Sequence, residues 1–376
     1  MAYSFKIFKD LQSLPQYWDK TIAIDNVLLS LKYFEVLENS KPYNMECYAV
    51  AFYNEKELIG GALFQYLDFE SHNTFQQSSS WCDLKNYIGK KFNKNVLIVG
   101  NNMLTGQNCF HFNFEKISPT EATILIERSV VEFQRNVKKT SLIIYKDFRK
   151  PALENFDQEY FKKYFRFSVQ PNMILELRKE WKKYEDYLGS FSKKYRDRAR
   201  SARRKFDGLE KKELFLDEII LYQNQINILY HNVAENAPFN TFFLSENHFY
   251  SLKEKLVGNF KIFGYFMDDQ MVGFYTFIIN KEKMDTYFLG YDKDLQKQKQ
   301  LYLNMLLDMV AYGIEFNFEK IVFGRTALEI KSTIGAEPVE IFGLIKHRNL
   351  LVNKFMSKIF PNIEPKVDWL QRKPFK

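Results

Sequence analysis

The chain has 376 residues, of which 46% are hydrophobic and 27% charged, enough apolar material for two or three folded domains. Its three cysteines, Cys47, Cys82 and Cys109, show neither metal-ligand spacing nor a redox motif, which is typical of a reducing cytoplasm. The sequence has no run of about 18 apolar residues and no signal-peptide pattern, so we expect a cytoplasmic protein without a membrane span.

The first half of the chain alternates apolar strands with amphipathic helices. Strands are expected over 4–8, 46–52, 57–66, 95–100 and 141–145, and helices over 26–37 and 121–137. The turn 53–56 predicts a hairpin between two of these strands. Ser118-Pro119 is a typical start signal for the second helix.

The second half repeats this order after a join near 150–170. A strand is expected at 173–177, helices at 184–189, 192–206, 214–234 and 246–257, and a strand meander over 261–291. A helix at 301–318, a strand at 320–323, a short helix ending at Gly335 and a last strand at 337–346 complete the pattern.

The doubled order predicts an α/β (α+β) fold of two modules, each a mixed, mostly antiparallel sheet flanked by helices. We place the modules at 1–150 and 173–376, with a connector over 151–172. Two domains of unrelated fold are the alternative, because the halves share no recognisable identity.

Several stretches of the second half carry a resemblance to a known family. They are GYFMDDQMVGFYTF, YFLGYDKD, AYGIEFNFEKIVFGR and EIKSTIGAEP. Their wording and order resemble the C-terminal module of FemAB-like proteins of the GNAT acyltransferase superfamily, often labelled peptidoglycan biosynthesis or recognition proteins. The resemblance implies tandem GNAT modules. It also implies acyl or aminoacyl transfer to an amine of a small-molecule or cell-envelope precursor, and an inactive protein that binds such a precursor is the alternative.

The segment expected to hold an acyl-CoA donor departs from the GNAT pattern. GNAT enzymes hold the CoA pyrophosphate on a Gly-rich loop at a helix N-terminus, whereas residues 292–302 contain no glycine. Lys293, Lys297 and Lys299 are possible phosphate contacts, and a solvated turn is the alternative reading. We therefore treat acyl-CoA as a doubtful cofactor, and no metal is expected.

A second candidate loop, 100–108, follows a buried strand in the first module. Asn101, Thr105 and Gly106 are its candidate ligand-binding residues, because short polar side chains and glycines suit a phosphate or polar substrate. FemAB-like sequences carry a similar turn here. An ordinary loop in which Asn and Gly supply positive-φ positions is the alternative.

The charge of the chain is concentrated in one helix region. Residues 179–212 hold 13 basic and 6 acidic residues, a net +7 of the chain's +8. Arg196, Arg200 and Arg203 form one stripe of the helix expected at 192–206 and are candidates for an anion site. A solvated helix face and RNA binding, as for an aminoacyl-tRNA donor, are the alternatives. Arg200→Ala is expected to weaken ligand binding at least about tenfold and to leave folding almost unaffected, because an exposed charge contributes little to stability.

The remaining candidates surround the second module's central strands. Arg325 and Lys331, after the strand at 320–323, are expected to donate to a carboxylate or phosphate, with a solvated surface charge as the alternative. Tyr291 and Asp285 are the candidate catalytic acid and base, with core packing as the alternative for the tyrosine. No Cys/His spacing suggests a metal, and the sequence leaves the oligomeric state open.

Overall fold

The computed structural model describes residues 3–69, 94–106, 110–237, 240–363 and 368–376. Cys82 and Cys109, and the Gln107-Asn108 end of the candidate loop, lie outside the described residues. The chain forms two compact units. Unit 1 comprises residues 1–170, 238–248 and 340–366, and unit 2 comprises 171–237, 249–339 and 367–376.

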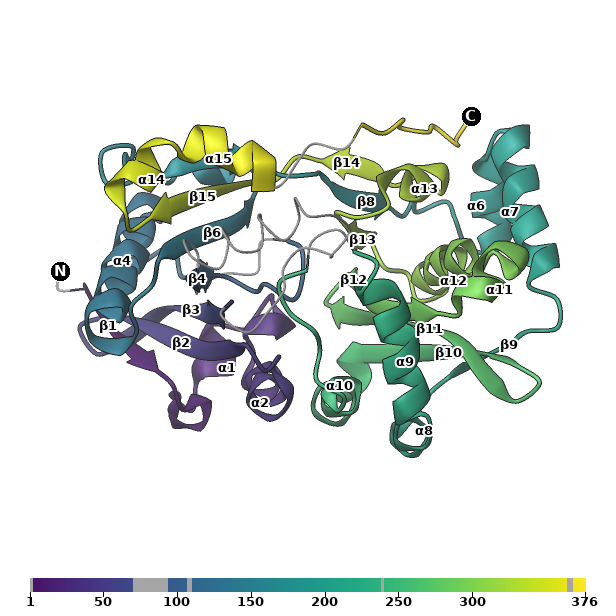
Figure 1. The fold of residues 1–376 in the computed structure, drawn as a ribbon, viewed down its shortest axis with the longest axis horizontal. Helices are drawn as coiled ribbons and strands as arrows, with labels where there is room; N and C mark the ends of the chain where they lie inside the picture. Colours follow the sequence, from purple (N-terminus) through teal and green to yellow (C-terminus); the bar gives the residue numbers. More distant parts are fainter. Residues whose placement is uncertain (1–2, 70–93, 107–109, 238–239, 364–367) are drawn as a thin grey trace, which may run out of the picture. The chain divides into compact units, whose positions relative to one another are not determined.

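Unit 1 is built on one mixed sheet (Figure 1). Its strands are β1 (Tyr3–Phe8), β2 (Met45–Asn54), β3 (Glu57–Asp68), β4 (Asn95–Val99), β5 (Phe110–Phe112), β6 (Leu142–Phe148), β7 (Phe165–Ser168) and β15 (Phe342–His347). They lie in the order β1-β2-β3-β4-β6-β15-β7, with β5 paired to β3. Every pairing is antiparallel except that of β4 with β6.

The helices of unit 1 pack against this sheet. They are α1 (Trp18–Thr21), α2 (Leu31–Ser40), α4 (Pro119–Glu132), α5 (Lys150–Leu153), α14 (Leu350–Lys354) and α15 (Met356–Ile363), with 3-10 turns at Leu11–Ser13 and Val27–Leu29 and a π turn at Phe133–Val137. The start of α4 is the one expected: Ser118 accepts from the Glu121 N–H, and the Glu121 carboxylate accepts from the Ser118 N–H. The sequence also suggested a short helix over 157–165 in the connector, but these residues form turns that lead into β7.

Unit 2 is built on a second mixed sheet. Its strands are β8 (Asn172–Glu176), β9 (Glu210–Glu213), β10 (Phe260–Met267), β11 (Gln270–Asn280), β12 (Lys283–Tyr291), β13 (Lys320–Gly324) and β14 (Glu337–Val339). They lie in the order β14-β8-β13-β12-β11-β10-β9, and only β12 and β13 are parallel. The β10–β11 hairpin turns at Asp268 and Asp269, both at positive φ, as the turn residues indicated.

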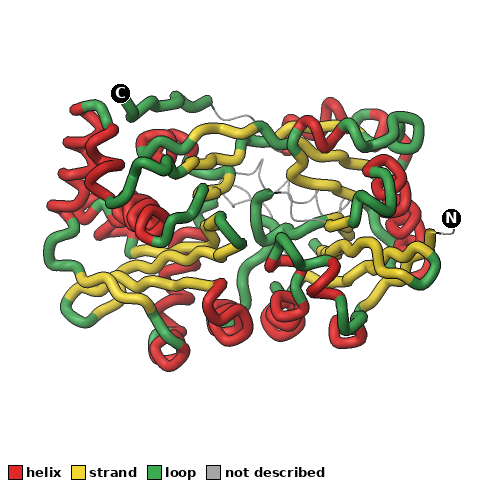
Figure 2. The backbone as a smooth tube through the Cα atoms, turned by 180° about the vertical axis from the view of Figure 1, so that it is seen from behind, coloured by secondary structure: helices red, strands yellow, loops and turns green. Residues whose placement is uncertain are grey.

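Helices cover both faces of this second sheet, as the red helices and yellow strands of Figure 2 show. They are α6 (Tyr184–Ser190), α7 (Lys193–Lys205), α8 (Leu216–Leu221), α9 (Gln223–Ala234), α10 (His248–Leu256), α11 (Lys293–Lys299), α12 (Leu301–Glu315) and α13 (Leu328–Thr333), with a 3-10 turn at Val257–Asn259. A Cβ at Gly290 would meet the backbone of Leu229 in α9, whereas one at Gly273 would meet Met305 in α12. Because these glycines point to opposite faces, α9 and α12 lie on opposite sides of the sheet.

The two units share one plan: an antiparallel meander, a helical crossover and a parallel strand. The expected α/β fold with two mixed sheets flanked by helices is therefore confirmed. Each sheet packs its own apolar cluster, one around Tyr48, Phe64 and Phe133, the other around Tyr265, Phe277 and Leu307.

The single last strand expected over 337–346 is wrong. The segment forms two short strands in different sheets: β14 pairs with β8, whereas β15 lies between β6 and β7. A short apolar strand has the same pattern in either sheet, because burial on both faces sets its composition rather than its partner.

Candidate functional site

The parallel strands of unit 2 separate after a short pairing. Within the described residues, β12 pairs with β13 only from Lys283–Lys320 to Asp285–Val322. Beyond this point β12 continues to Tyr291, and its residues Thr286–Leu289 are partly exposed. We call the β13-facing side of Thr286–Leu289 the open edge.

A β-bulge accompanies the open edge. Tyr275 pairs with Leu289, and Phe277 with Thr286, so β12 has one extra residue between these pairs. The Thr276 hydroxyl donates to the carbonyl of Phe288 at 2.6 Å and holds the bulge. A bulge bends its strand and re-aims side chains, and such bulges are common beside active sites.

Tyr291 ends β12. Its phenol is partly exposed and lies 6.3 Å, between ring centroids, from Tyr302 of α12. Burial raises the pKa of Tyr291 above its ordinary value, so the phenol keeps its proton at neutral pH. Tyr291 is therefore able to donate a proton to a leaving group.

Asp285, the other catalytic candidate, lies far from Tyr291. Six residues of β strand separate them, roughly 20 Å. Tyr291 is opposite Gly273 on the α12 face, while Asp285 is opposite Ile278, whose neighbour Phe277 contacts Tyr312 of α12. Successive residues alternate between faces, so Asp285 points to the other side of the sheet. The two side chains are not brought together.

The surroundings of Asp285 shift the pKa of its carboxyl group. Burial raises the pKa of its carboxyl, an effect that nearby Lys283, 3.5 Å away, partly opposes. One carboxylate oxygen has no hydrogen-bond partner.

Lys331 is not a solvated surface charge. The side chain, on α13, is 4% exposed, and its Nζ donates to the carbonyl of Phe323 at 2.5 Å, which places the amine at the carboxyl end of β13. Burial lowers the pKa of Lys331 to about 7, because a buried site disfavours the charged ammonium form. Arg325, just beyond β13, is partly exposed.

The helix N-termini that follow β12 are already capped by the protein. The Asp292 carboxylate accepts from the N–H groups of Asp294 and Leu295, at 2.8 and 3.0 Å, and begins α11. The Tyr302 N–H at the start of α12 donates to the Gln296 side chain at 3.0 Å. A carboxylate at the first of these ends opposes a bound anion there.

The arginine stripe of α7 is divided between different partners. Arg196 donates to the carbonyl of Phe191 at 3.2 Å, and Arg203 pairs with Asp308 of α12 at 2.8 Å. Arg200 is exposed. The three guanidinium groups are therefore not gathered on one ligand site, and Arg203 serves as an internal ion-pair partner.

Asp308 is the centre of this polar cluster, which sequence reasoning missed. It is buried and accepts from the Tyr265 hydroxyl at 2.5 Å, with Lys211 3.6 Å away. The available signal was a lone carboxylate in the otherwise apolar helix 301–314.

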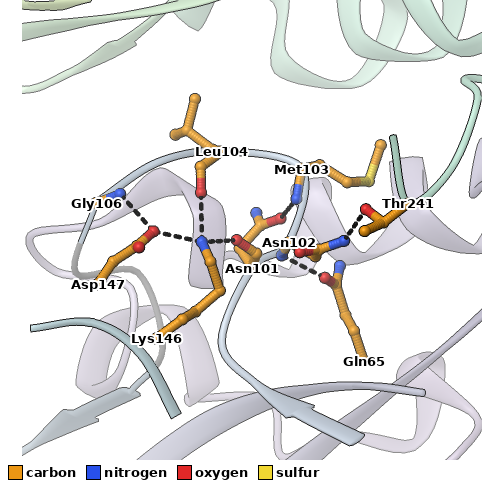
Figure 3. Close-up of polar contacts among 9 residues, drawn as sticks. All are labelled: Gln65, Asn101, Asn102, Met103, Leu104, Gly106, Lys146, Asp147 and Thr241. Atoms are coloured by element: carbon orange, nitrogen blue, oxygen red, sulfur yellow. Dashed lines mark hydrogen bonds and ion pairs between the residues drawn. The ribbon is translucent and has the colours of Figure 1, made fainter. Parts of the chain in front are cut away.

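The corresponding place in unit 1 is filled by two charged residues (Figure 3). The parallel β4–β6 pairing ends at Val99 and Tyr145, and Lys146 and Asp147 follow. The Lys146 ammonium donates to the carbonyls of Asn101 and Leu104, both at 2.9 Å, and pairs with Asp147.

The predicted loop residues of unit 1 are held by the protein itself. Asn101 is buried and donates to the Tyr33 hydroxyl at 2.8 Å, and the Gly106 N–H donates to Asp147 at 3.0 Å. Thr105 is partly exposed. Figure 3 also shows Asn102 held by Gln65 and Thr241. Lys146 and Asp147, two charged residues directly after an apolar strand, are the sequence signal that could have indicated these contacts.

A groove of about 640 Å³ in unit 1 contains none of the predicted residues. It lies beside Tyr17, His111 and Phe114. The described ranges contain no cluster of three or more His, Cys, Asp or Glu side chains able to hold a metal. Within the same ranges, no helix combines the length and apolar character needed to span a bilayer.

Comparison with solved structures identifies the fold. FemX aligns over 88% of this chain and 94% of its own, with a TM-score of 0.55 and 11% identity. A tandem GNAT protein from the clavulanic acid biosynthesis pathway covers 93% and 99%, with a TM-score of 0.51 and 9% identity. A conserved protein of unknown function from Bacteroides thetaiotaomicron covers 92% and 100%, at 0.51 and 9%.

These likenesses show that the chain has a GNAT-type fold. More narrowly, the chain has a FemAB-like fold with two GNAT-type modules, as the sequence motifs indicated. No protein-family model and no curated protein matches the sequence. At such low identity the structural likeness extends to the fold, and function has to be argued from the site.

Proposed function

We propose that the chain is an N-acyltransferase whose reacting centre lies at the open edge of β12. The observation that carries the proposal is the contrast between the units. Both have a parallel strand pair of GNAT type, but Lys146 and Asp147 fill the end of the pair in unit 1. In unit 2, β12 continues past the pairing with a partly exposed edge and a bulge.

This edge suits acyl transfer for a physical reason. An acceptor amine loses a proton and attacks the acyl carbonyl, so negative charge develops on the carbonyl oxygen. Backbone N–H groups held in fixed positions at a strand edge are suitable donors for that oxygen. In our proposal Tyr291 protonates the leaving group, because its raised pKa keeps it neutral.

Lys331 keeps its expected role as an anion donor in this proposal and is not assigned the role of proton acceptor. Its amine contacts the carbonyl of Phe323, which follows Val322, the residue opposite Asp285, so the amine lies at the level of Asp285 rather than of Tyr291. The amine lies at the end of β13, where the two parallel strands have separated. In its charged form the amine would serve as the expected anion donor, together with Arg325, which lies six residues earlier in the sequence.

The donor in this proposal is an acylated molecule held by side chains. The capped starts of α11 and α12 leave the backbone a poor pyrophosphate site, which argues against acetyl-CoA. Arg200 and Arg325 are the proposed anion contacts. An aminoacyl-tRNA donor and a small-molecule or cell-envelope amine acceptor come from the FemAB-like resemblance, and both await a binding test.

The test is a thermal-shift screen against acyl-CoAs, aminoacyl-tRNA and nucleotide-sugar precursors. A ligand at about a hundred times its Kd stabilises the folded state by about 2.7 kcal/mol. With the ligand in hand, Tyr291→Phe should lower turnover by about a hundredfold or more and preserve binding. Tyr195→Phe, a partly buried tyrosine on α7, is the control. Unchanged turnover in Tyr291→Phe would overturn the proposed role.

A precursor-binding protein without catalysis is the second candidate. The capped helix ends and the separation of Asp285 from Tyr291 favour it. In that case a ligand would raise the melting temperature, but no product would form and Tyr291→Phe would behave like the wild type.

A further inference from the structure

An apolar and basic surface lies on the C-terminal helices of unit 1. Leu350 and Leu351 are 73% and 71% exposed, and Phe355 is 49% exposed. Arg348, Lys354 and Lys358 beside them are exposed as well. We call these six residues the apolar–basic patch. Residues 341–363 contain no Asp or Glu, so the segment itself is basic.

The patch is held rigidly by its inward side. Met356 and Phe360 are buried, and the Phe360 ring packs 4.3 Å from that of Phe167 on β7. Figure 1 shows α14 and α15 beside β15, and α15 also contacts β7. The exposed Leu and Phe side chains therefore belong to helices that are anchored to the sheet.

Two asparagines fix α14 itself. The Asn349 side chain accepts from the N–H groups of Leu351 and Val352, at 2.9 and 3.2 Å. Asn353 donates to the carbonyl of Lys163 at 2.8 Å and accepts from the His347 N–H at 2.8 Å. Neighbouring exposed leucines in a well-anchored helix leave apolar surface in water, which is unfavourable unless a partner covers it.

We propose that the apolar–basic patch docks unit 1 on an anionic phospholipid surface. Leucine and phenylalanine side chains insert at the headgroup–acyl boundary, while lysine and arginine remain at the phosphate level. Each basic side chain near an anionic membrane strengthens binding roughly fivefold. The inference is independent of the proposed transferase activity.

The chemistry of the patch disfavours other occupants. A second copy placed by a two-fold axis would bring Arg348, Lys354 and Lys358 against the same residues of its partner, and like charges repel. Nucleic acid would gain from the basic groups but not from Leu350 and Leu351, which offer neither stacking nor hydrogen bonds. An anionic bilayer uses both halves of the patch.

Vesicle co-sedimentation of the full chain tests the proposal. Vesicles of phosphatidylcholine mixed with phosphatidylglycerol should bind the protein at least tenfold more tightly than phosphatidylcholine alone, and added salt should weaken the binding. Lys354→Gln/Lys358→Gln should lower the affinity by roughly 25-fold. Leu350→Ser/Leu351→Ser should abolish the residual binding that persists at high salt.

The matched control is Ile24→Ser/Lys32→Gln, an exposed apolar and an exposed basic residue elsewhere on unit 1. Its vesicle affinity should equal that of the wild type, and circular dichroism should show all variants folded. Equal affinity for neutral and anionic vesicles, or no binding to either, would overturn the proposal. So would a dimer, seen by analytical ultracentrifugation, that Leu350→Ser/Leu351→Ser dissociates.

Discussion

Lys331 has a consequence for stability that depends on pH. Its pKa is about 7 in the folded chain, against an ordinary value of 10.5. Between these values the unfolded chain binds more protons than the folded one, so this group makes stability rise with pH from about 7 to about 10.5. Below pH 7 the full cost of burying the ammonium is present, on the order of 1.36 kcal/mol for each unit of pKa difference.

Lys331→Met should therefore raise the melting temperature relative to the wild type most at pH 6 and least near pH 10. The lost bond to the Phe323 carbonyl reduces the gain at every pH but does not change its slope. Thermal unfolding across this pH series measures the difference. Lys297→Met, an exposed lysine on α11, is the control and should show no such trend. A pH-independent difference for Lys331→Met would contradict the assignment.

For single residues, the sequence indicated which charged side chains form specific contacts, but it did not predict their partners. Lys331 and Arg203 were chosen as anion donors because of their charge. In the structure, Lys331 donates to the carbonyl of Phe323 and Arg203 pairs with Asp308. Their partners lie eight residues away for Lys331 and 105 for Arg203, and burial in the fold decides which of these contacts form.

Among the elements, α7 gives the sharpest test. Arg203→Ala would leave buried Asp308 with Tyr265 and the more distant Lys211. Removing one partner of a buried pair costs about 3–5 kcal/mol, and partial exposure of Arg203 reduces this to about 2–3 kcal/mol. Arg200→Ala, on the exposed side of the same helix, should change the free energy of unfolding by about 0.5 kcal/mol or less.

Urea denaturation of the two variants measures both values. A similar small effect for both would mean that the Arg203–Asp308 pair contributes little. The expectation that Arg200→Ala leaves folding almost unaffected stays a prediction. Arg203 differs from Arg200, because its side chain bridges α7 and α12 rather than facing water.

A second prediction at this scale concerns the starts of α11 and α12. Acetyl-CoA should bind weakly or not at all, because Asp292 and Gln296 already occupy N–H groups there. Isothermal calorimetry measures the affinity, with the wild type and Asp292→Asn compared. The variant removes the carboxylate charge but keeps a side-chain acceptor. Tight, saturable binding to the wild type, lost on substitution within 292–302, would refute the prediction.

Local sequence signals predicted most helices and strands. The features that they did not predict depend on how strands pair with one another. The helix expected over 192–206 is present as α7, and the hairpin turns at 53–56 and 268–270 lie where the turn residues indicated. The bulge at the open edge was not predictable, because it depends on the register of β12 against β11.

For the whole molecule, the two mixed sheets were predictable but their strand membership was not. The order of elements along the chain indicated both sheets, since hairpins and crossovers join neighbours in sequence. Residues 238–248 and 340–366 instead belong with unit 1, far from it in sequence. Hydrophobic periodicity predicts that a strand is buried, but it does not predict which sheet the strand joins.

The position of β15 makes the folding of unit 1 depend on the C-terminal part of the chain. Within the described residues, β7 pairs only with β15, and β15 also pairs with β6. A chain ending at Val339 loses β15 and should lose the hydrogen-bonded protection of β7 and of the β6 amides that face β15, while the pairing of β6 with β4 remains. A chain ending at Lys366 keeps β15 and removes only residues 367–376, which belong to unit 2.

Amide hydrogen exchange on this matched pair separates the two effects. In the chain ending at Lys366, β6 and β7 should exchange as slowly as in the full chain, because their pairing with β15 is intact. This chain should instead lose amide protection in unit 2, because residues 367–376 contact that unit. The Ser192 N–H donates to the Pro374 carbonyl at 2.8 Å, and the Phe375 ring lies 5.4 Å from that of Phe191. In the chain ending at Val339, β7 should exchange as fast as an unpaired segment. Full protection of β7 in that shorter chain would show that unit 1 closes its sheet without β15.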